Sequence, residues 1–149
     1  MLNPELIHPC QNLPHSGSMC LLDAVVSIDE QSITCSTHSH KGENNPLRSD
    51  GQLASINAIE YAAQAMAIHA GCTYHEQGRK NMLGFLASAR DIQCFRQRLD
   101  DIAGELSINA TRLAVINDGF SYQFQVLAEQ QLVVSGRLSI RVVSEDTKP

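Results

Sequence analysis

The feature that most constrains the fold is a stretch of twenty residues that is apolar on every side. Residues 53–72, LASINAIEYAAQAMAIHAGC, predict a helix of about 30 Å at 1.5 Å per residue. Because alanines occur on all of its faces, we expect it to be buried rather than amphipathic. It nevertheless contains Asn57, Glu60 and Gln64, whose spacing places them in one polar stripe. Burial favours the protonated form of a carboxyl group, so Glu60 is the strongest candidate for proton donation.

Length and charge limit the classes of protein to consider. A chain of 149 residues with 43% hydrophobic residues suits one domain with a substantial core. We expect a single domain over residues 1–149, with 1–18 as a lead-in and 144–149 as a polar tail. The formal charge of -5 and the lack of a basic run argue against nucleic acid or an anionic membrane as partner. No signal peptide pattern opens the chain, and the polar stripe argues against a membrane span, which predicts a cytoplasmic protein.

Cysteine and histidine spacing gives no sign of a metal site. The five cysteines are an odd number, widely spaced and without a CxxC pair, so we expect reduced, small core residues. His38 and His40 alternate on one expected strand, but no third ligand follows at a suitable spacing. His69, on the long helix, is expected to be a packed imidazole. We therefore predict no metal.

The remaining sequence shows a period of two, which is typical of strands. The strands expected are residues 19–28, 32–40, 82–96, 104–116, 120–126 and 132–143. Asn117, Asp118 and Gly119 predict a hairpin turn, because Asn and Gly tolerate positive φ. The loop 41–52 is rich in turn residues and leads to the helix. Backbone N–H groups near Gly51 are expected to stabilise a developing negative charge at the helix start.

The expected order is two strands, one long buried helix and four antiparallel strands. A single helix of this kind is covered only if the sheet curls around it, since a flat sheet leaves much of its circumference in water. The sequence therefore predicts an α+β hot-dog fold. One side of the helix and an edge strand remain uncovered, so we expect a dimer with a continuous sheet, formed either by two copies of this chain or with a related hot-dog subunit.

Two motifs resemble a known family of hot-dog enzymes. LPHSGSMCLLDAV at 13–25 and IEYAAQAMAIHAG at 59–71 resemble the 3-hydroxyacyl-acyl carrier protein dehydratases. HSGSMCLLD, the segment Asn45-Pro46-Leu47-Arg48 and residues 59–67 look most like the ApeP-type dehydratase-like proteins of aryl polyene biosynthesis. The resemblance implies loss of water from a 3-hydroxyacyl thioester that is carried on the phosphopantetheine of acyl carrier protein or coenzyme A, without a bound cofactor.

The resemblance also suggests roles for single residues. Glu60 matches the family's carboxylate and would be the acid, and Gln64 would orient it or a water. The family's Gly-His-Phe-Pro tetrapeptide is absent, and His40 in HKGENNPL is the nearest counterpart of its base. Arg48 either contacts the pantetheine phosphate or an acidic carrier surface, or is a solvated loop residue. Asn57 and Gln64 are each either part of the substrate site or a buried amide bound to the backbone.

Three functions follow from these observations. The first is a 3-hydroxyacyl-thioester dehydratase, acting alone or in a heterodimer with a related hot-dog subunit that supplies a histidine. The second is a hot-dog acyl thioesterase in which Glu60 activates water. The third is a non-catalytic subunit that stabilises a sister dehydratase.

Overall fold

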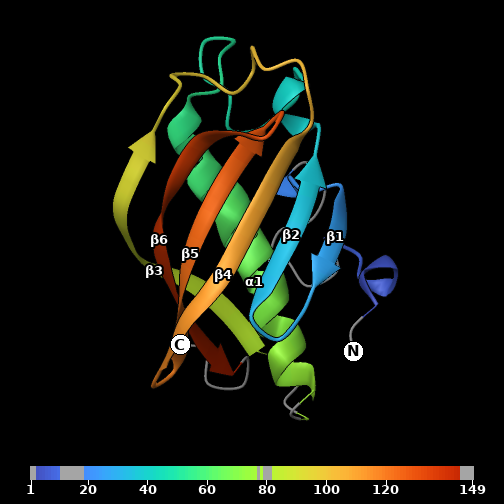
Figure 1. Cartoon of the computed structure of the whole chain (residues 1–149), viewed down its shortest axis with the longest axis vertical. Helices are drawn as coiled ribbons and strands as arrows, with labels where there is room; N and C mark the ends of the chain where they lie inside the picture. Colours follow the sequence, from blue (N-terminus) through green and yellow to red (C-terminus); the bar gives the residue numbers. More distant parts are fainter. Residues whose placement is uncertain (1–2, 11–18, 77, 79–81, 145–149) are drawn as a thin grey trace.

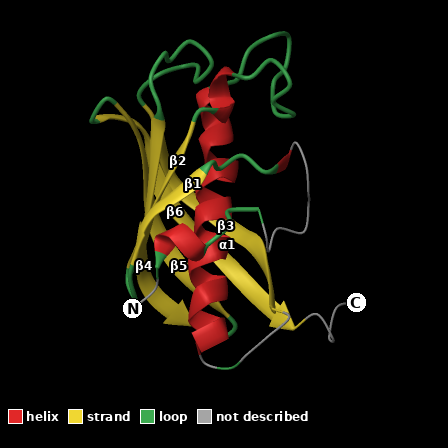
Figure 2. Ribbon diagram, turned by 90° about the vertical axis from the view of Figure 1, so that its right-hand side faces the viewer, coloured by secondary structure: helices red, strands yellow, loops and turns green. Residues whose placement is uncertain are grey.

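One long helix packs against one side of a curved antiparallel sheet (Figures 1 and 2). The computed structural model describes residues 3–10, 19–76, 78 and 82–144. The helix, α1, spans Ala58–Glu76. The α+β hot-dog fold expected from the sequence is confirmed. Residues 13–18 of the quoted motif and residues 145–149 of the expected tail lie outside the described residues.

The sheet joins the strands on both sides of the helix in the sequence. Its strands are β1 (Ala24–Ile28), β2 (Ser32–Thr37), β3 (Met82–Cys94), β4 (Leu106–Ile116), β5 (Gly119–Ala128) and β6 (Gln131–Ser144). Their order is β1-β2-β4-β5-β6-β3, and each neighbouring pair is antiparallel. Strand β3 follows the helix directly but pairs with β6, which places it at one edge of the sheet.

The core lies between α1 and the concave face of the sheet. Along β5, Tyr122 and Phe124 are buried whereas Gln123 and Gln125 are exposed, as the period of two predicted. Tyr61 and other apolar residues of α1 are fully buried against this face. Because α1 packs against β2 to β6, the curl of the sheet accounts for an apolar helix with alanines on all sides.

The helix begins later than the sequence predicted. Residues 55–57 form a short 3-10 turn, η4 (Ser55–Asn57), and α1 starts at Ala58 rather than at Leu53. The Leu53 N–H donates to Asp100 Oδ1 at 2.9 Å, and the Leu53 carbonyl accepts from Leu99 N at 2.8 Å. Since a distant loop uses these backbone groups, they are not available for helical hydrogen bonds.

Two surfaces of the chain remain uncovered, as expected from the sequence. On α1, Glu60, Ala63, Ala67 and Gly71 are half-buried and recur at three or four residues, which places them along one side. At the sheet edge, residues 84–87 of β3 are exposed, including Phe85 and Leu86 at 48% and 45%. Within the described part of the chain, no helix combines the length and apolarity needed to cross a membrane.

Candidate functional site

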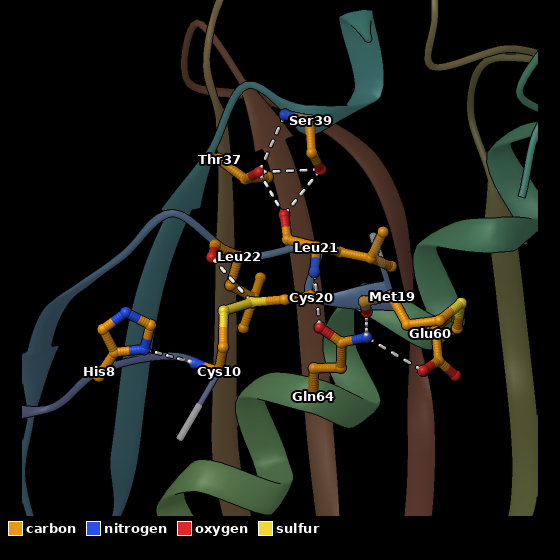
Figure 3. Close-up of a disulfide and its surroundings, with 10 residues drawn as sticks. All are labelled: His8, Cys10, Met19, Cys20, Leu21, Leu22, Thr37, Ser39, Glu60 and Gln64. Carbon is orange, nitrogen blue, oxygen red and sulfur yellow. Dashed lines mark hydrogen bonds between the residues drawn. A yellow bond between two sulfur atoms is a disulfide. The ribbon is translucent and has the colours of Figure 1, made fainter. Parts of the chain in front are cut away.

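Glu60 and Gln64 lie one turn apart on α1 and contact each other (Figure 3). Gln64 Nε2 donates to Glu60 Oε1 at 3.2 Å. Gln64 is buried, whereas Glu60 is half-buried on the uncovered side of the helix. The structure therefore brings together two of the three residues of the predicted polar stripe.

Gln64 also holds the chain segment that leads into β1. Its Oε1 accepts a hydrogen bond from Leu21 N at 3.0 Å, and its Nε2 donates to Met19 O at 2.7 Å. Both amide hydrogens and the amide oxygen are thus engaged, which fixes the orientation of the Gln64 amide. The Gln64 amide therefore presents one oriented N–H donor to Glu60 Oε1. These contacts also explain why β1 begins at Ala24 rather than Met19, since backbone groups ahead of it bond to side chains.

A second set of hydrogen bonds starts from the other side of Leu21. The Leu21 carbonyl accepts from Ser39 Oγ at 2.7 Å and from Thr37 Oγ1. Ser39 Oγ lies 2.9 Å from the hydroxyl of Tyr61, the helix residue next to Glu60. Asn45 Nδ2 donates to the same hydroxyl at 2.9 Å. The network therefore joins the helix around Glu60 to the turn η3 (Ser39–Lys41), which contains His40.

His40 is fully buried in this chain. Its Nε2 lies 3.0 Å from the carbonyl oxygen of Ile102, so that nitrogen bears the proton and donates. Nδ1 has no hydrogen-bond partner among the described residues. Burial lowers the pKa of the imidazole below its ordinary value. His40 is thus a neutral imidazole with one free basic nitrogen, but within the described residues no hydrogen bond links it to Glu60.

The other three predicted site residues contact their own loop. Asn57 Nδ2 donates to Ala54 O, the residue before η4, at 3.1 Å. Arg48 donates to the backbone carbonyls of Gly42, Gly51 and His40 at 2.8, 2.9 and 3.3 Å. These bonds give Arg48 a role in holding the loop.

The prediction that Gly51 lies at the start of the helix is wrong. Gly51 occupies a turn at φ +74° and lies seven residues before Ala58, the first residue of α1. Its backbone N–H is therefore not one of the free donors at the helix N-terminus, because the chain from Leu53 to Ser55 pairs with the segment 97–100 instead.

His69 and His38, the two other histidines considered in the sequence, contact residues outside the Glu60–Gln64 pair. His69 is buried between Tyr122 and the turn after β1, with Nδ1 2.7 Å from the Tyr122 hydroxyl and Nε2 2.8 Å from Asp29 O. The expectation of a packed imidazole is confirmed. His38 pairs with Glu105 at 3.3 Å on the surface. Among the described residues, no group of three His, Cys, Asp or Glu side chains is arranged to hold a metal ion.

The cysteines differ from the prediction of reduced core residues. Cys10 and Cys20 form a disulfide, and Cys94 is exposed; only Cys35 is a fully buried free thiol, with its pKa raised by burial to about 12. A separation of ten residues in an odd set of five gives no sequence signal for this pair. The prediction is therefore wrong for Cys10, Cys20 and Cys94.

The sequence interpretation also missed Tyr61, Ser39 and Asn45. A signal was present for Tyr61, because a tyrosine inside an apolar helix needs a hydrogen-bond partner when it is buried. Nothing in the local sequence identifies Ser39 and Asn45 as those partners, since they lie 22 and 16 residues away.

Two cavities open on other parts of the surface. One, of about 380 Å³, lies between the loop at 54–56 and residues 94–97 at the end of β3. The other, of about 270 Å³, lies beside the β4–β5 hairpin and includes Phe120 and Ile140. Neither is lined by Glu60 or His40.

Comparison with solved structures shows the same fold in other proteins. The dehydratase heterocomplex ApeI:P from Xenorhabdus doucetiae matches with a TM-score of 0.81 and 22% identity over 98% of this chain and 95% of that chain. Thioesterase HI1161 from Haemophilus influenzae matches with a TM-score of 0.60 and 13% identity over 81% and 78%. A mutant of thioesterase PA1618 from Pseudomonas aeruginosa gives 0.60 and 12% over 80% of each chain.

Sequence comparison with curated proteins gives no significant match. The family profile described as ApeP-like, ApeP dehydratase, matches residues 7–148, which is nearly the whole chain and includes both Glu60 and Gln64. The chain therefore belongs to the ApeP-like dehydratase family.

Proposed function

We propose that this chain is a subunit of a 3-hydroxyacyl-thioester dehydratase that works as a heterodimer with a related hot-dog subunit. The observation that carries the proposal is the Glu60 carboxyl group, half-buried on an apolar helix and held through one oxygen by Gln64. Membership of the ApeP-like dehydratase family supports the reaction class. The similarity to a dehydratase heterocomplex supports the second subunit.

The reaction needs an acid, a base and a means to hold the thioester. A base removes the proton on C2, the bond between C3 and the hydroxyl oxygen breaks, and an acid protonates the departing hydroxyl so that water leaves. In our proposal Glu60 is the acid. Because Gln64 Nε2–H occupies Oε1, the transferable proton resides on the other carboxyl oxygen.

The base is the second requirement. His40 has the right protonation state, since its Nδ1 lone pair is free, but its ring is enclosed within this chain. We therefore propose His40 as base only where the partner subunit opens access to Nδ1, and a histidine of that subunit as the alternative. In both cases the complete site requires two chains.

The uncovered surfaces fit this proposal. The edge of β3 around Phe85 and Leu86 offers unpaired backbone groups and exposed apolar side chains, which a strand of a second subunit would cover. Glu60 lies at one end of the half-buried side of α1, so a subunit placed there would also enclose the carboxyl group.

The substrate and setting are further parts of the proposal. We propose that the acyl chain is carried on the phosphopantetheine of an acyl carrier protein, with coenzyme A as the alternative carrier, and that no other cofactor takes part. The family name supports a place in aryl polyene biosynthesis. The cytoplasm is the compartment in which such carriers and a chain of this type are expected.

The test is an assay of the chain alone and in complex with its sister subunit. With 3-hydroxybutyryl thioester as substrate, the complex should form the crotonyl thioester, and Glu60→Gln should lower kcat about 10²- to 10⁴-fold. Glu129→Gln, in the exposed turn between β5 and β6, is the matched control and should leave kcat unchanged. Unchanged activity of Glu60→Gln in both the isolated chain and the complex contradicts the role of Glu60 as the acid.

A thioesterase is the second candidate, because two structures with this fold are described as thioesterases. The same assay distinguishes the two reactions by product. A free acid with release of a thiol indicates hydrolysis, whereas an enoyl thioester indicates dehydration.

The proposed interface has its own test. Leu86→Lys places a charge on the β3 edge and should abolish complex formation in size-exclusion chromatography. Val115→Lys is the matched control, since Val115 is 68% exposed on β4, far along the sheet order from β3. Equal complex formation by both variants rules out the β3 edge as the interface with the second subunit.

A further inference from the structure

The Cys10–Cys20 disulfide lies beside the residues that hold Glu60 (Figure 3). The two Cα atoms are 5.5 Å apart, within the usual range for a disulfide. Both cysteines are half-buried. The bond joins the short N-terminal turn η1 (Pro4–Leu6) and the residues after it to the segment that leads into β1.

Cys20 lies between the two backbone groups that Gln64 holds. Met19 O accepts from Gln64 Nε2 at 2.7 Å, and Leu21 N donates to Gln64 Oε1 at 3.0 Å. A displacement of Cys20 therefore moves both backbone partners of the Gln64 amide. The same amide donates to Glu60 Oε1, so the disulfide is two contacts away from the carboxyl group.

We propose that Cys10–Cys20 is a thiol–disulfide exchange site whose oxidation state sets how firmly Gln64 holds Leu21 and Glu60. The reductant is a dithiol. Its thiolate attacks one sulfur of the pair, the bond between the two cysteine sulfurs breaks, and the other sulfur leaves as a thiolate. The second thiol of the reductant then resolves the mixed disulfide. Two electrons and two protons pass to Cys10 and Cys20, and the reductant ends as a disulfide.

The oxidised pair keeps the segment at Met19 and Leu21 against Gln64. The reduced pair lacks this constraint, so the Leu21 amide exchanges faster with solvent and Glu60 loses a fixed donor. The faster exchange of the Leu21 amide follows from the fold and does not depend on any catalytic role. The effect on turnover rests on the proposed function of Glu60.

The structural effect is measured by hydrogen exchange of the Leu21 amide in NMR spectra of the full chain, before and after reduction with dithiothreitol. Alkylation and intact mass count the thiols, with three expected in the oxidised protein and five in the reduced protein. We expect exchange at Leu21 to accelerate at least tenfold on reduction. Cys10→Ser should show the fast rate in both conditions, and Cys94→Ser, which removes an exposed free thiol, should respond as the native chain does.

Two results overturn the proposal at the level of the fold. One is reaction of all five cysteines after treatment with oxidised glutathione, and the other is equal Leu21 exchange in the two states of the native chain. Because the oxidised and reduced forms of the native chain are compared directly, the test does not require Cys10→Ser to fold well. In the complex, we expect reduction to lower kcat several-fold, and unchanged kcat with faster Leu21 exchange overturns the control of Glu60. If the complex has no dehydratase activity in either state, the proposed function fails while the exchange result still decides the redox site.

Discussion

The hydroxyl of Tyr61 lies 2.9 Å from Asn45 Nδ2, which joins the residue next to Glu60 to the loop that follows His40. Tyr61 is fully buried, and burial raises the pKa of its phenol, so the hydroxyl keeps its proton. Asn45 uses its other amide hydrogen on Ser39 O at 3.0 Å. The Tyr61 hydroxyl thus accepts from Asn45 Nδ2 and lies 2.9 Å from Ser39 Oγ, which in turn contacts Leu21 O. Buried hydrogen bonds therefore connect α1 at Tyr61 with the loop at Asn45.

Removal of the Tyr61 hydroxyl should therefore destabilise the protein. In Tyr61→Phe the Asn45 amide loses a buried acceptor, and we expect the free energy of unfolding to fall by about 1–3 kcal/mol. Urea unfolding measures the change. A double-mutant cycle with Asn45→Ala should give a coupling energy of about 0.5–3 kcal/mol. Additive effects of the two substitutions would contradict the contact.

Gln64→Ala should lower the free energy of unfolding by a similar amount, because Gln64 binds the N–H of Leu21. It leaves the Leu21 N–H and the Met19 carbonyl without their partner, at a cost of about 1–3 kcal/mol in the free energy of unfolding. Gln123→Ala on the exposed face of β5 is the matched control and should stay within about 0.5 kcal/mol of the native chain. Equal urea midpoints for the two variants would show that Gln64 does not hold this segment.

Stability should decrease as the pH falls below about 6.5. Burial lowers the pKa of both His40 and His69 from the ordinary value of 6.5. Above pH 6.5 both imidazoles are neutral in the folded and in the unfolded chain. Below pH 6.5 they bind protons in the unfolded chain but not yet in the folded chain. The free energy of unfolding then falls by up to about 1.4 kcal/mol per pH unit for each histidine, until the lower folded pKa is reached.

Urea unfolding between pH 7.5 and 5.0 measures this slope. His69→Gln removes one of the two buried histidines, so it should reduce the slope by up to about 1.4 kcal/mol per pH unit. Asp29 and Asp100 have lowered pKa values, so their contribution changes only below about 3.8 and does not enter this range. An identical slope in His69→Gln and the native chain would contradict the assignment.

The Asp100 carboxylate should stabilise the folded protein, whereas the carboxylate of the neighbouring Asp101 should contribute little. Arg98, and then the Leu53 N–H, lower the pKa of the Asp100 carboxyl group, which is 6% exposed. Asp101 pairs with Arg96 at the surface, where such pairs contribute little. We expect Asp100→Asn to lower Tm at pH 7 and Asp101→Asn to leave it nearly unchanged.

The pH dependence of the Asp100 variant provides a second check. Because the folded pKa is depressed, the contribution of the ionised group is present above the ordinary pKa of 3.8 and is lost as the pH falls through the folded pKa. The Tm difference between Asp100→Asn and the native chain should thus shrink below pH 4. A difference that stays constant to pH 2 would exclude the ionised carboxylate as its source.

The sequence by itself determined the architecture and the pair at the centre of the site. Alanines on every face of one helix require a sheet that curls around it, and alternation in the later strands supplies that sheet. Glu60 and Gln64 are four residues apart, so helical geometry alone brings their side chains together. Local periodicity is enough to predict which faces of a helix or strand are buried and which side chains on one helix lie side by side.

Only the tertiary structure decided which backbone groups and distant side chains meet. The helix starts at Ala58 because Leu99 and Asp100 bind the backbone of Leu53, from 46 and 47 residues away along the chain. The enclosure of His40 beneath Ile102 and the bonding of Tyr61 to Asn45 arise in the same way. The pairing of Cys10 with Cys20 likewise needs the path of the chain in space. Such contacts depend on how the chain folds back on itself, and neither hydrophobic period nor residue type encodes them locally.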